Sequence, residues 1–203
     1  MYGMIAAVPA ALVELGIAEE LKNIGLPTAL MTPIYVFLGI GLIEEIFKYL
    51  VVRKKILCHP EFDEPMDIML YMIISALGFA ALENLLILLP YLSPFQFMET
   101  FVVSGFRFVG ATFLHALASG LVGYFLVLSF FNPQKRTQLT IQGLFTAALL
   151  HGLYNFSIIK IDDGFKFAIP VIILLGLLFF ILLGFKKVAK LKSICLPADR
   201  QVK

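Results

Sequence analysis

Long apolar stretches decide what this chain can fold into. Five of them are long enough to cross a bilayer, which takes about 20 helical residues. They cover residues 28–52, 68–89, 101–131, 139–159 and 167–185. A sixth stretch, residues 4–17, is shorter and contains Pro9 and Glu14. Charged residues make up only 15% of the chain, well below the share in soluble domains. The sequence therefore predicts an all-α, polytopic transmembrane helix bundle of about six spans.

The basic residues predict the orientation of these spans, because loops on the cytoplasmic side carry most of the Lys and Arg. Of the 16 basic residues, eleven lie in alternate loops and the C-terminal tail, three lie in the opposite loops, and Lys48 and Arg107 lie inside spans. This split predicts six crossings with both termini in the cytoplasm. We expect a single transmembrane domain, residues 1–190, followed by a short basic cytoplasmic tail, residues 191–203. No basic stripe of the kind that binds nucleic acid is present, so we expect no nucleic-acid partner.

Glu44, Glu45 and Lys48 stand inside an apolar stretch, where an ionisable side chain is costly and therefore marks a candidate functional site. Lys48 follows the two glutamates by four and three residues and shares a helical face with both. A salt bridge that joins two helices would need only one glutamate. The second leaves a surplus negative charge in a low dielectric. This surplus favours a carboxyl that can accept a proton, as a general base or a proton shuttle must.

Three more ionisable residues lie within other stretches. Glu83 follows a run of small residues, which let helices approach closely, so we expect Glu83 to point into the bundle. His115 shares a helical stripe with Ser119, and His151 lies one turn before Asn155. A lone histidine in a span is often a satisfied core residue. Two histidines on different helices indicate a shared site, because imidazole is both an acid–base group and a common zinc ligand.

Two interpretations of these residues stay open from the residues alone. Glu83, His115 and His151 would make a three-ligand site for a divalent metal such as zinc, with one position left for water and the Glu44–Glu45 pair as base. Alternatively, the same groups hold a water molecule directly, without a metal.

Depth along the helices tests whether these residues can meet. At a rise of ~1.5 Å per residue, Glu83 and the two histidines lie roughly 22–26 Å from the cytoplasmic ends of their helices. On the same count, the glutamate pair lies at roughly 12–14 Å. The two depths agree only if the second helix is tilted or extends past Val52 to Lys55.

Taken in chain order, four motifs resemble those of the PrsW family of intramembrane proteases. They are Glu44-Glu45-x-x-Lys48, Gly78-Phe79-Ala80-x-x-Glu83-Asn84, His115 in a helix of small residues, and His151-x-x-x-Asn155. The lead-in Asp63-Glu64-Pro65-Met66-Asp67 is similar to the Asp-Pro-x-Asp that precedes the third helix in that family. The PrsW family is a distant relative of the CaaX prenyl endopeptidase and bacteriocin-immunity group, whose second motif is Phe-x-x-x-His. The resemblance covers residues 6 to 156.

The resemblance implies a CaaX-protease-like fold and an endopeptidase of the cytoplasmic (inner) membrane of bacteria. Its expected partners are the lipid bilayer and a membrane protein substrate, classically an anti-sigma factor.

The resemblance also implies roles for individual residues. Glu44 and Glu45 would be the catalytic pair, Lys48 would tune them, and Asn155 would donate a hydrogen bond to the tetrahedral intermediate. Glu83, His115 and His151 would be metal ligands or would hold the water. We assign Asn84 and Arg107 to substrate binding.

Two other classes of function use the same residues. A proton- or ion-coupled transporter would relay charge through Glu44, Glu45, Lys48 and the histidines. Transporters often show inverted repeats and broken helices, and no such symmetry is visible in this sequence. A non-catalytic membrane scaffold is the third interpretation. Inactive relatives of an enzyme usually lose one motif, whereas all four are present here.

The charge count makes a direct prediction of topology. Reporter fusions at Lys135 and in the C-terminal tail should both give a cytoplasmic signal, because the basic residues gather there. Paired alkaline phosphatase and fluorescent-protein fusions measure this. A periplasmic signal at either position contradicts the predicted orientation.

Overall fold

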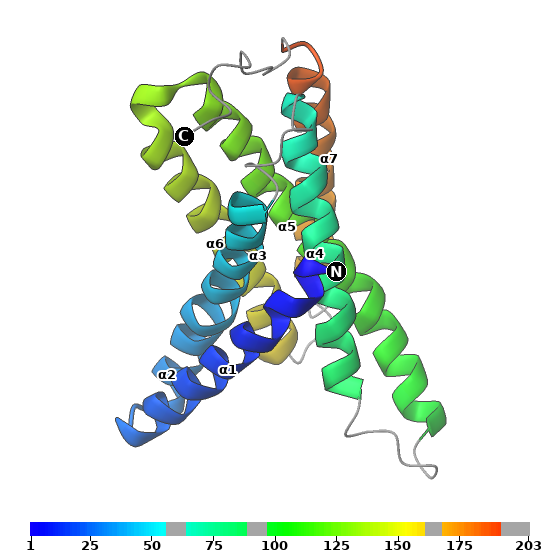
Figure 1. Ribbon diagram of the computed structural model, residues 1–203. Helices are drawn as coiled ribbons and strands as arrows, with labels where there is room; N and C mark the ends of the chain where they lie inside the picture. The colour runs from blue at the N-terminus through cyan, green and yellow to red at the C-terminus, as the bar shows by residue number, and fades with distance from the viewer. Residues whose placement is uncertain (56–63, 89–96, 161–167, 192–203) are drawn as a thin grey trace.

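The computed structural model describes residues 1–55, 64–88, 97–160 and 168–191, and these residues are almost entirely helical. Figure 1 shows a bundle of long helices without strands in the described ranges. The predicted all-α membrane bundle is confirmed. The elements in chain order are α1 (Tyr2–Asn23), α2 (Thr28–Ile34), the π-helix η1 (Tyr35–Leu42), α3 (Ile43–Lys55), α4 (Pro65–Leu88), α5 (Phe97–Phe131), the 3₁₀-helix η3 (Pro133–Lys135), α6 (Arg136–Lys160) and α7 (Ala168–Val188).

Four helical segments of the described chain are long and apolar enough to cross a membrane. They are Thr28–Lys54, Pro65–Leu88, Phe108–Phe131 and Ala168–Val188. The first of these runs without interruption through α2, η1 and α3. The two remaining long helices, α1 and α6, are less apolar than the four spans. The protein is therefore a multi-pass membrane protein, with α1 and α6 packed among its spans.

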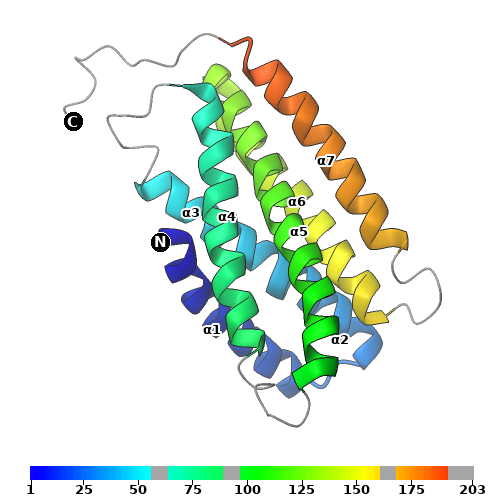
Figure 2. The same ribbon diagram turned by 90° about the vertical axis from the view of Figure 1, so that its right-hand side faces the viewer.

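The lower half of the bundle in Figure 1 divides into two legs. One leg holds α1 beside α2 and η1, and the other holds α4 beside the first half of α5. α6 packs against both η1 and α5 and so joins the two legs, while α7 packs on the outside of α5 (Figure 2). The N-terminus lies about halfway up the bundle rather than at its edge. Helices from both legs therefore meet at mid-height.

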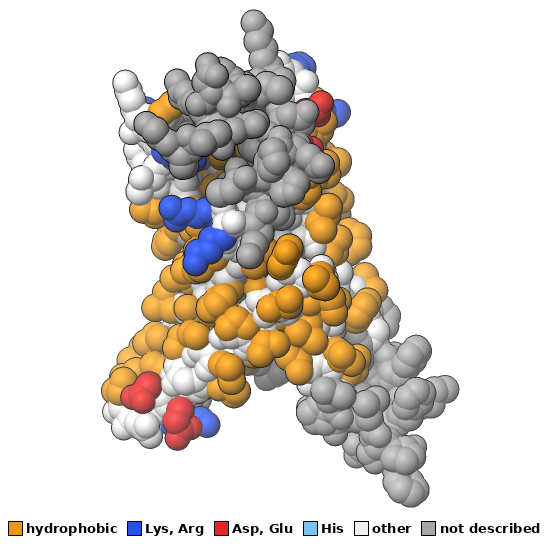
Figure 3. Space-filling model, in the orientation of Figure 1, with side chains coloured by type: hydrophobic (Ala, Val, Ile, Leu, Met, Phe, Trp, Pro, Cys, Tyr) orange, Lys and Arg blue, Asp and Glu red, His pale blue; other side chains and the backbone are white. Residues whose placement is uncertain are grey.

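The surface of the bundle is suited to lipid. In Figure 3, hydrophobic side chains cover the middle of the visible face, and the charged side chains in view lie above and below it. Large apolar side chains such as Leu12, Phe145, Ile172 and Phe179 are more than half exposed. A continuous apolar surface of this extent is unusual for a soluble protein and fits a helix bundle in a bilayer.

η1 and α6 approach each other closely through two glycines. A Cβ on Gly41 would lie 2.7 Å from the carbonyl oxygen of Ala148. A Cβ on Gly152 would collide with the ring of Phe37. Small residues permit this spacing of helix backbones. Because Gly41 lies shortly before the Glu44–Glu45 pair and Gly152 directly follows His151, this contact brings the motifs on α3 and α6 together.

Gly41→Ala should therefore destabilise the bundle. The added methyl group meets the backbone of α6, and overpacking of this kind costs about 1–3 kcal/mol. Thermal unfolding in detergent measures the effect as a lower transition temperature. The matched control is Gly176→Ala on α7, where nothing lies within 4 Å of the added Cβ. Equal transition temperatures for the two variants would contradict the close packing of η1 on α6.

Candidate active site

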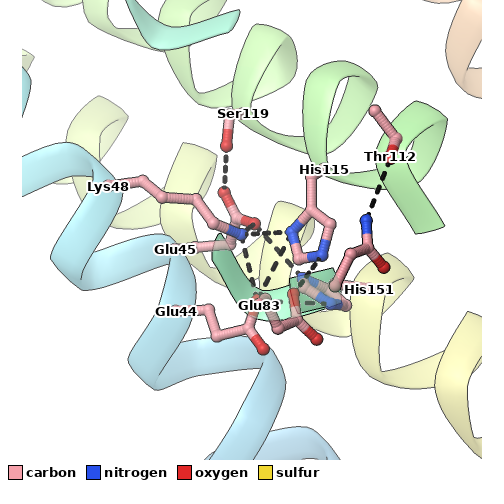
Figure 4. Close-up of polar contacts among 9 residues, drawn as sticks. Glu44, Glu45, Lys48, Glu83, Thr112, His115, Ser119 and His151 are labelled. Carbon is pink, nitrogen blue, oxygen red and sulfur yellow. Dashed lines mark hydrogen bonds and ion pairs between the residues drawn. The ribbon is translucent and has the colours of Figure 1, made fainter. Parts of the chain in front are cut away.

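A buried lysine lies at the centre of the site. The Nζ atom of Lys48 donates to Glu44 Oε2 at 3.1 Å and to Glu45 Oε1 at 2.9 Å, and it lies 2.7 Å from Nδ1 of His115 (Figure 4). It also lies 4.5 Å from the centroid of the Phe79 ring. The side chains of Glu44, Glu45 and Lys48 are all buried, with Lys48 and Glu45 at 0% exposure. One ammonium group thus contacts both adjacent carboxylates and offsets one of their two negative charges, because a buried charge needs a partner.

Both glutamates point inward because α3 is enclosed on most of its circumference. It contacts α1, η1, α4, α5 and α6. Glu44 and Glu45 are neighbours in the sequence, so they face different partners. Glu45 accepts a hydrogen bond from Ser119 on α5 at 2.8 Å and lies 3.2 Å from Nδ1 of His151 on α6. The π-helix η1 ends directly before this segment, and π-helical turns often occur next to functional sites.

Each histidine lies between two carboxylates. Nδ1 of His115 is 3.4 Å from Glu44, and its Nε2 is 2.7 Å from Glu83. Nε2 of His151 is 3.7 Å from Glu44, and its Nδ1 is 3.2 Å from Glu45. The two imidazole rings are 4.9 Å apart between centroids and perpendicular to each other. Glu44 therefore lies between the two histidines, while Glu83 and Glu45 flank them on the far sides.

The structure resolves the difference in depth expected from the sequence. α3 continues to Lys55, and the rod formed by α2, η1 and α3 is inclined within the bundle (Figure 1). Both conditions bring the glutamate pair to the level of Glu83 and the histidines. The five predicted residues consequently form one cluster from four helices.

The cluster opens onto a cavity of about 280 Å³. Its polar lining includes Glu44, Glu83, His115 and the predicted oxyanion donor Asn155. Glu45 and Lys48 lie behind this lining. Glu83 is the most accessible of the three carboxylates in the cluster, with 28% of its side chain exposed. Of these carboxylates, Glu44 and Glu83 are the ones that can touch a molecule in the cavity.

Sequence reasoning missed two polar residues that line this cavity, Glu14 from α1 and Tyr154 from α6. Glu14 had a visible signal, because it is an acidic residue within the apolar stretch 4–17. Tyr154 directly precedes Asn155 and carried no signal of its own.

The two residues expected to bind substrate occupy different positions. Asn84 on α4 is buried, and its Nδ2 donates to Oγ1 of Thr112 on α5 at 3.2 Å. This hydrogen bond connects α4 to α5 one residue after Glu83. Arg107 lies in α5, but its side chain is outside the described residues. Substrate binding by Asn84 and Arg107 therefore stays a prediction.

The chemistry of the cluster fits a divalent metal. Glu44, His115 and His151 each offer one ligand atom, and these atoms lie within 4.8 Å of one another. A carboxylate and two imidazoles form a known catalytic zinc set that leaves a position for water. Metal-bound histidines usually direct their second nitrogen at a carboxylate, as His115 does toward Glu83 and His151 toward Glu45. The ammonium group of Lys48 supplies a positive charge among the same acceptors.

Comparison with known proteins gives a consistent result. The family model described as PrsW family intramembrane metalloprotease matches residues 1–183. Protease PrsW of Geobacillus kaustophilus is 30% identical over 155 residues, which is 76% of this chain and 63% of that protein. Protease PrsW of Oceanobacillus iheyensis is 34% identical over 145 residues, which is 70% of this chain and 62% of that protein. Protease PrsW of Bacillus subtilis is 27% identical over 159 residues, 78% of this chain and 67% of that protein.

In the relatives from Geobacillus kaustophilus and Oceanobacillus iheyensis, the matched region covers less than two thirds of the protein's length. No solved structure is significantly similar to the chain. The resemblance inferred from the four motifs is confirmed by the family match, which covers most of the chain. This chain belongs to the PrsW family.

Proposed function

We propose that this protein is an intramembrane endopeptidase that hydrolyses a peptide bond of a membrane-associated protein. The observation that carries the proposal is the position of Glu44, Glu83 and His115 on one cavity, backed by the buried Lys48 and Glu45. Hydrolysis needs a group that takes a proton from water and a group that stabilises the developing oxyanion. The cavity holds carboxylates for the first task and Asn155 for the second. The name of the family, PrsW family intramembrane metalloprotease, supports the same activity.

Glu44 and Glu83 are the residues we place against the reacting water, because both line the cavity. Glu45 contacts Lys48, Ser119 and His151 instead. Its proposed role is to hold the ammonium group and to orient the His151 ring. We therefore divide the predicted catalytic pair into Glu44, which faces the reactants, and Glu45, which positions the residues around them.

A bound metal would change which carboxylate accepts the proton from water. A divalent ion such as zinc, held by Glu44, His115 and His151, would activate water and polarise the scissile carbonyl. Glu83 lines the cavity beside this group and would then accept the proton. Without a metal, Glu44 accepts the proton and Lys48 supplies the positive charge. The geometry of the donor set favours Glu44 over the predicted Glu83 as the carboxylate ligand.

The substrate must reach a cavity that lies among membrane helices. A single-pass protein whose helix unwinds near the scissile bond meets this requirement, because its peptide bond can then enter at the depth of Glu44. Resemblance to the family suggests an anti-sigma factor as the substrate. The basic side of the bundle is proposed to face the cytoplasm from the inner membrane.

Glutamine variants test the assignment of the carboxylates. Glu44→Gln and Glu45→Gln should each reduce cleavage of a co-reconstituted single-pass substrate by ~10²–10⁴-fold, because glutamine retains the shape but cannot accept a proton or balance Lys48. Glu20→Gln on the exposed part of α1 is the matched control and should cleave normally. Full activity of both site variants would remove the pair from the mechanism. Proton-coupled flux without any cleavage would point to a transporter instead.

Metal content tests the ligand set. Purified wild-type protein should carry close to one equivalent of zinc or a similar divalent ion, measured by inductively coupled plasma mass spectrometry. His115→Ala and His151→Ala should each lose the metal and the activity, because each removes one of three ligands. His59→Ala, which removes the third histidine of the chain, should retain both. Active protein that contains no metal and resists chelators would contradict metal assistance. It would indicate that Glu44 accepts the proton from water.

A further inference from the structure

A second polar cavity, of about 520 Å³, lies away from the active site. It is formed by the C-terminal part of α3, the C-terminal end of α5 and the first turns of α6, and it shares no lining residue with the catalytic cavity. These helix ends lie in the upper half of Figure 1, and Figure 3 shows Lys and Arg side chains on the same part of the molecule. This is the side on which the basic residues predict the cytoplasm.

The lining of this cavity is positively charged. Arg53 comes from α3 and Arg136 from α6, and none of the described residues that line the cavity is acidic. Each guanidinium packs on an aromatic ring, with Cζ of Arg53 5.9 Å from the centroid of Tyr49 and Cζ of Arg136 4.9 Å from that of Phe130. These distances are within the range of a cation–π contact, and a guanidinium carries five N–H donors and no acceptor. Two arginines held in this way suit a phosphate group.

The remaining lining has two parts of different polarity. Hydroxyl groups of Ser129, Thr137 and Thr140 accompany the arginines. Leu126, Ile141 and Leu144 line the rest, and Ile141 is 59% exposed at the apolar surface of α6. The cavity therefore joins a cationic, hydroxyl-rich end to a surface that faces the hydrocarbon. A phospholipid has the same division into a phosphate head and acyl chains.

We propose that this cavity is a binding site for the head group of an anionic phospholipid, such as phosphatidylglycerol. Basic pockets between transmembrane helices on the cytoplasmic side recognise phosphate head groups, and a bilayer presents such groups at this depth. Bound lipid would connect the end of α3 to α5 and α6. Because Tyr49 directly follows Lys48, the lipid would hold the helix that carries the catalytic glutamates in register with the histidines.

Native mass spectrometry of delipidated protein in detergent tests the site. Wild type should retain phosphatidylglycerol in preference to phosphatidylcholine and should unfold at a higher temperature with the former. Arg53→Gln and Arg136→Gln should each weaken phosphatidylglycerol binding about 10-fold, the loss expected for a hydrogen bond to a charged group. Lys54→Gln removes the same charge from an exposed neighbour that does not line the cavity, and should bind as wild type does.

Two soluble phosphate ligands and one conservative variant distinguish binding at this site from other causes of lipid binding. Glycerol 3-phosphate and inorganic phosphate should not raise the unfolding temperature, because they lack acyl chains. Arg136→Lys retains the charge and should bind better than Arg136→Gln, which would show that the glutamine variant loses affinity through the lost positive charge and not through misfolding. Unchanged lipid binding in both glutamine variants would overturn the proposal. So would an equal loss in Lys54→Gln, or full stabilisation by a soluble phosphate.

Discussion

The rest of this structure depends on the contact of one buried ammonium group with two buried carboxylates. Burying a charge without a partner costs several kcal/mol, and removing one partner of a buried pair typically costs about 3–5 kcal/mol. Lys48 therefore belongs in the interior only together with Glu44 and Glu45, and the glutamates only together with Lys48. Since Lys48 also reaches His115 on α5 and Glu45 reaches His151 on α6, this contact fixes three helices relative to one another.

The same network prepares the chemistry that we propose. Glu45 accepts hydrogen bonds from Lys48 and Ser119 and lies beside His151, so its position is determined from three sides. Glu44 shares Lys48 but also lines the cavity. One carboxylate of the pair is thus enclosed among its hydrogen-bond partners, and the other faces the cavity in which we place the reactants. Preorganised charge in a site with little water is the main means by which enzymes stabilise a transition state.

The sequence was sufficient to predict the membrane bundle and the members of the polar cluster. Ionisable residues are so rare in apolar stretches that Glu44, Glu83, His115 and His151 were identifiable without a structure. Ser119 shares the predicted helical stripe of His115, and its hydroxyl group donates a hydrogen bond to Glu45.

Other features depend on how the helices cross, which hydropathy does not specify. The association of Glu44 rather than Glu83 with the two histidines depends on side-chain distances of a few ångströms. The hydrogen bond of Asn84 to Thr112 and the entry of Glu14 into the cavity depend on helix rotation and tilt. The π-helix η1, which precedes the glutamate pair, has no simple signal in the residue pattern.

In the mechanism that we propose, Lys48 and Glu45 act as one unit in support of the reaction. A double-mutant cycle on the cleavage rate of a single-pass membrane substrate measures whether they do so, with Lys48→Met, Glu45→Gln and the double variant compared with wild type. Residues that act as a unit are strongly non-additive. The double variant should therefore be about as slow as the slower single variant. A rate loss in the double variant equal to the product of the two single losses would show that Lys48 and Glu45 act independently, and would contradict this account.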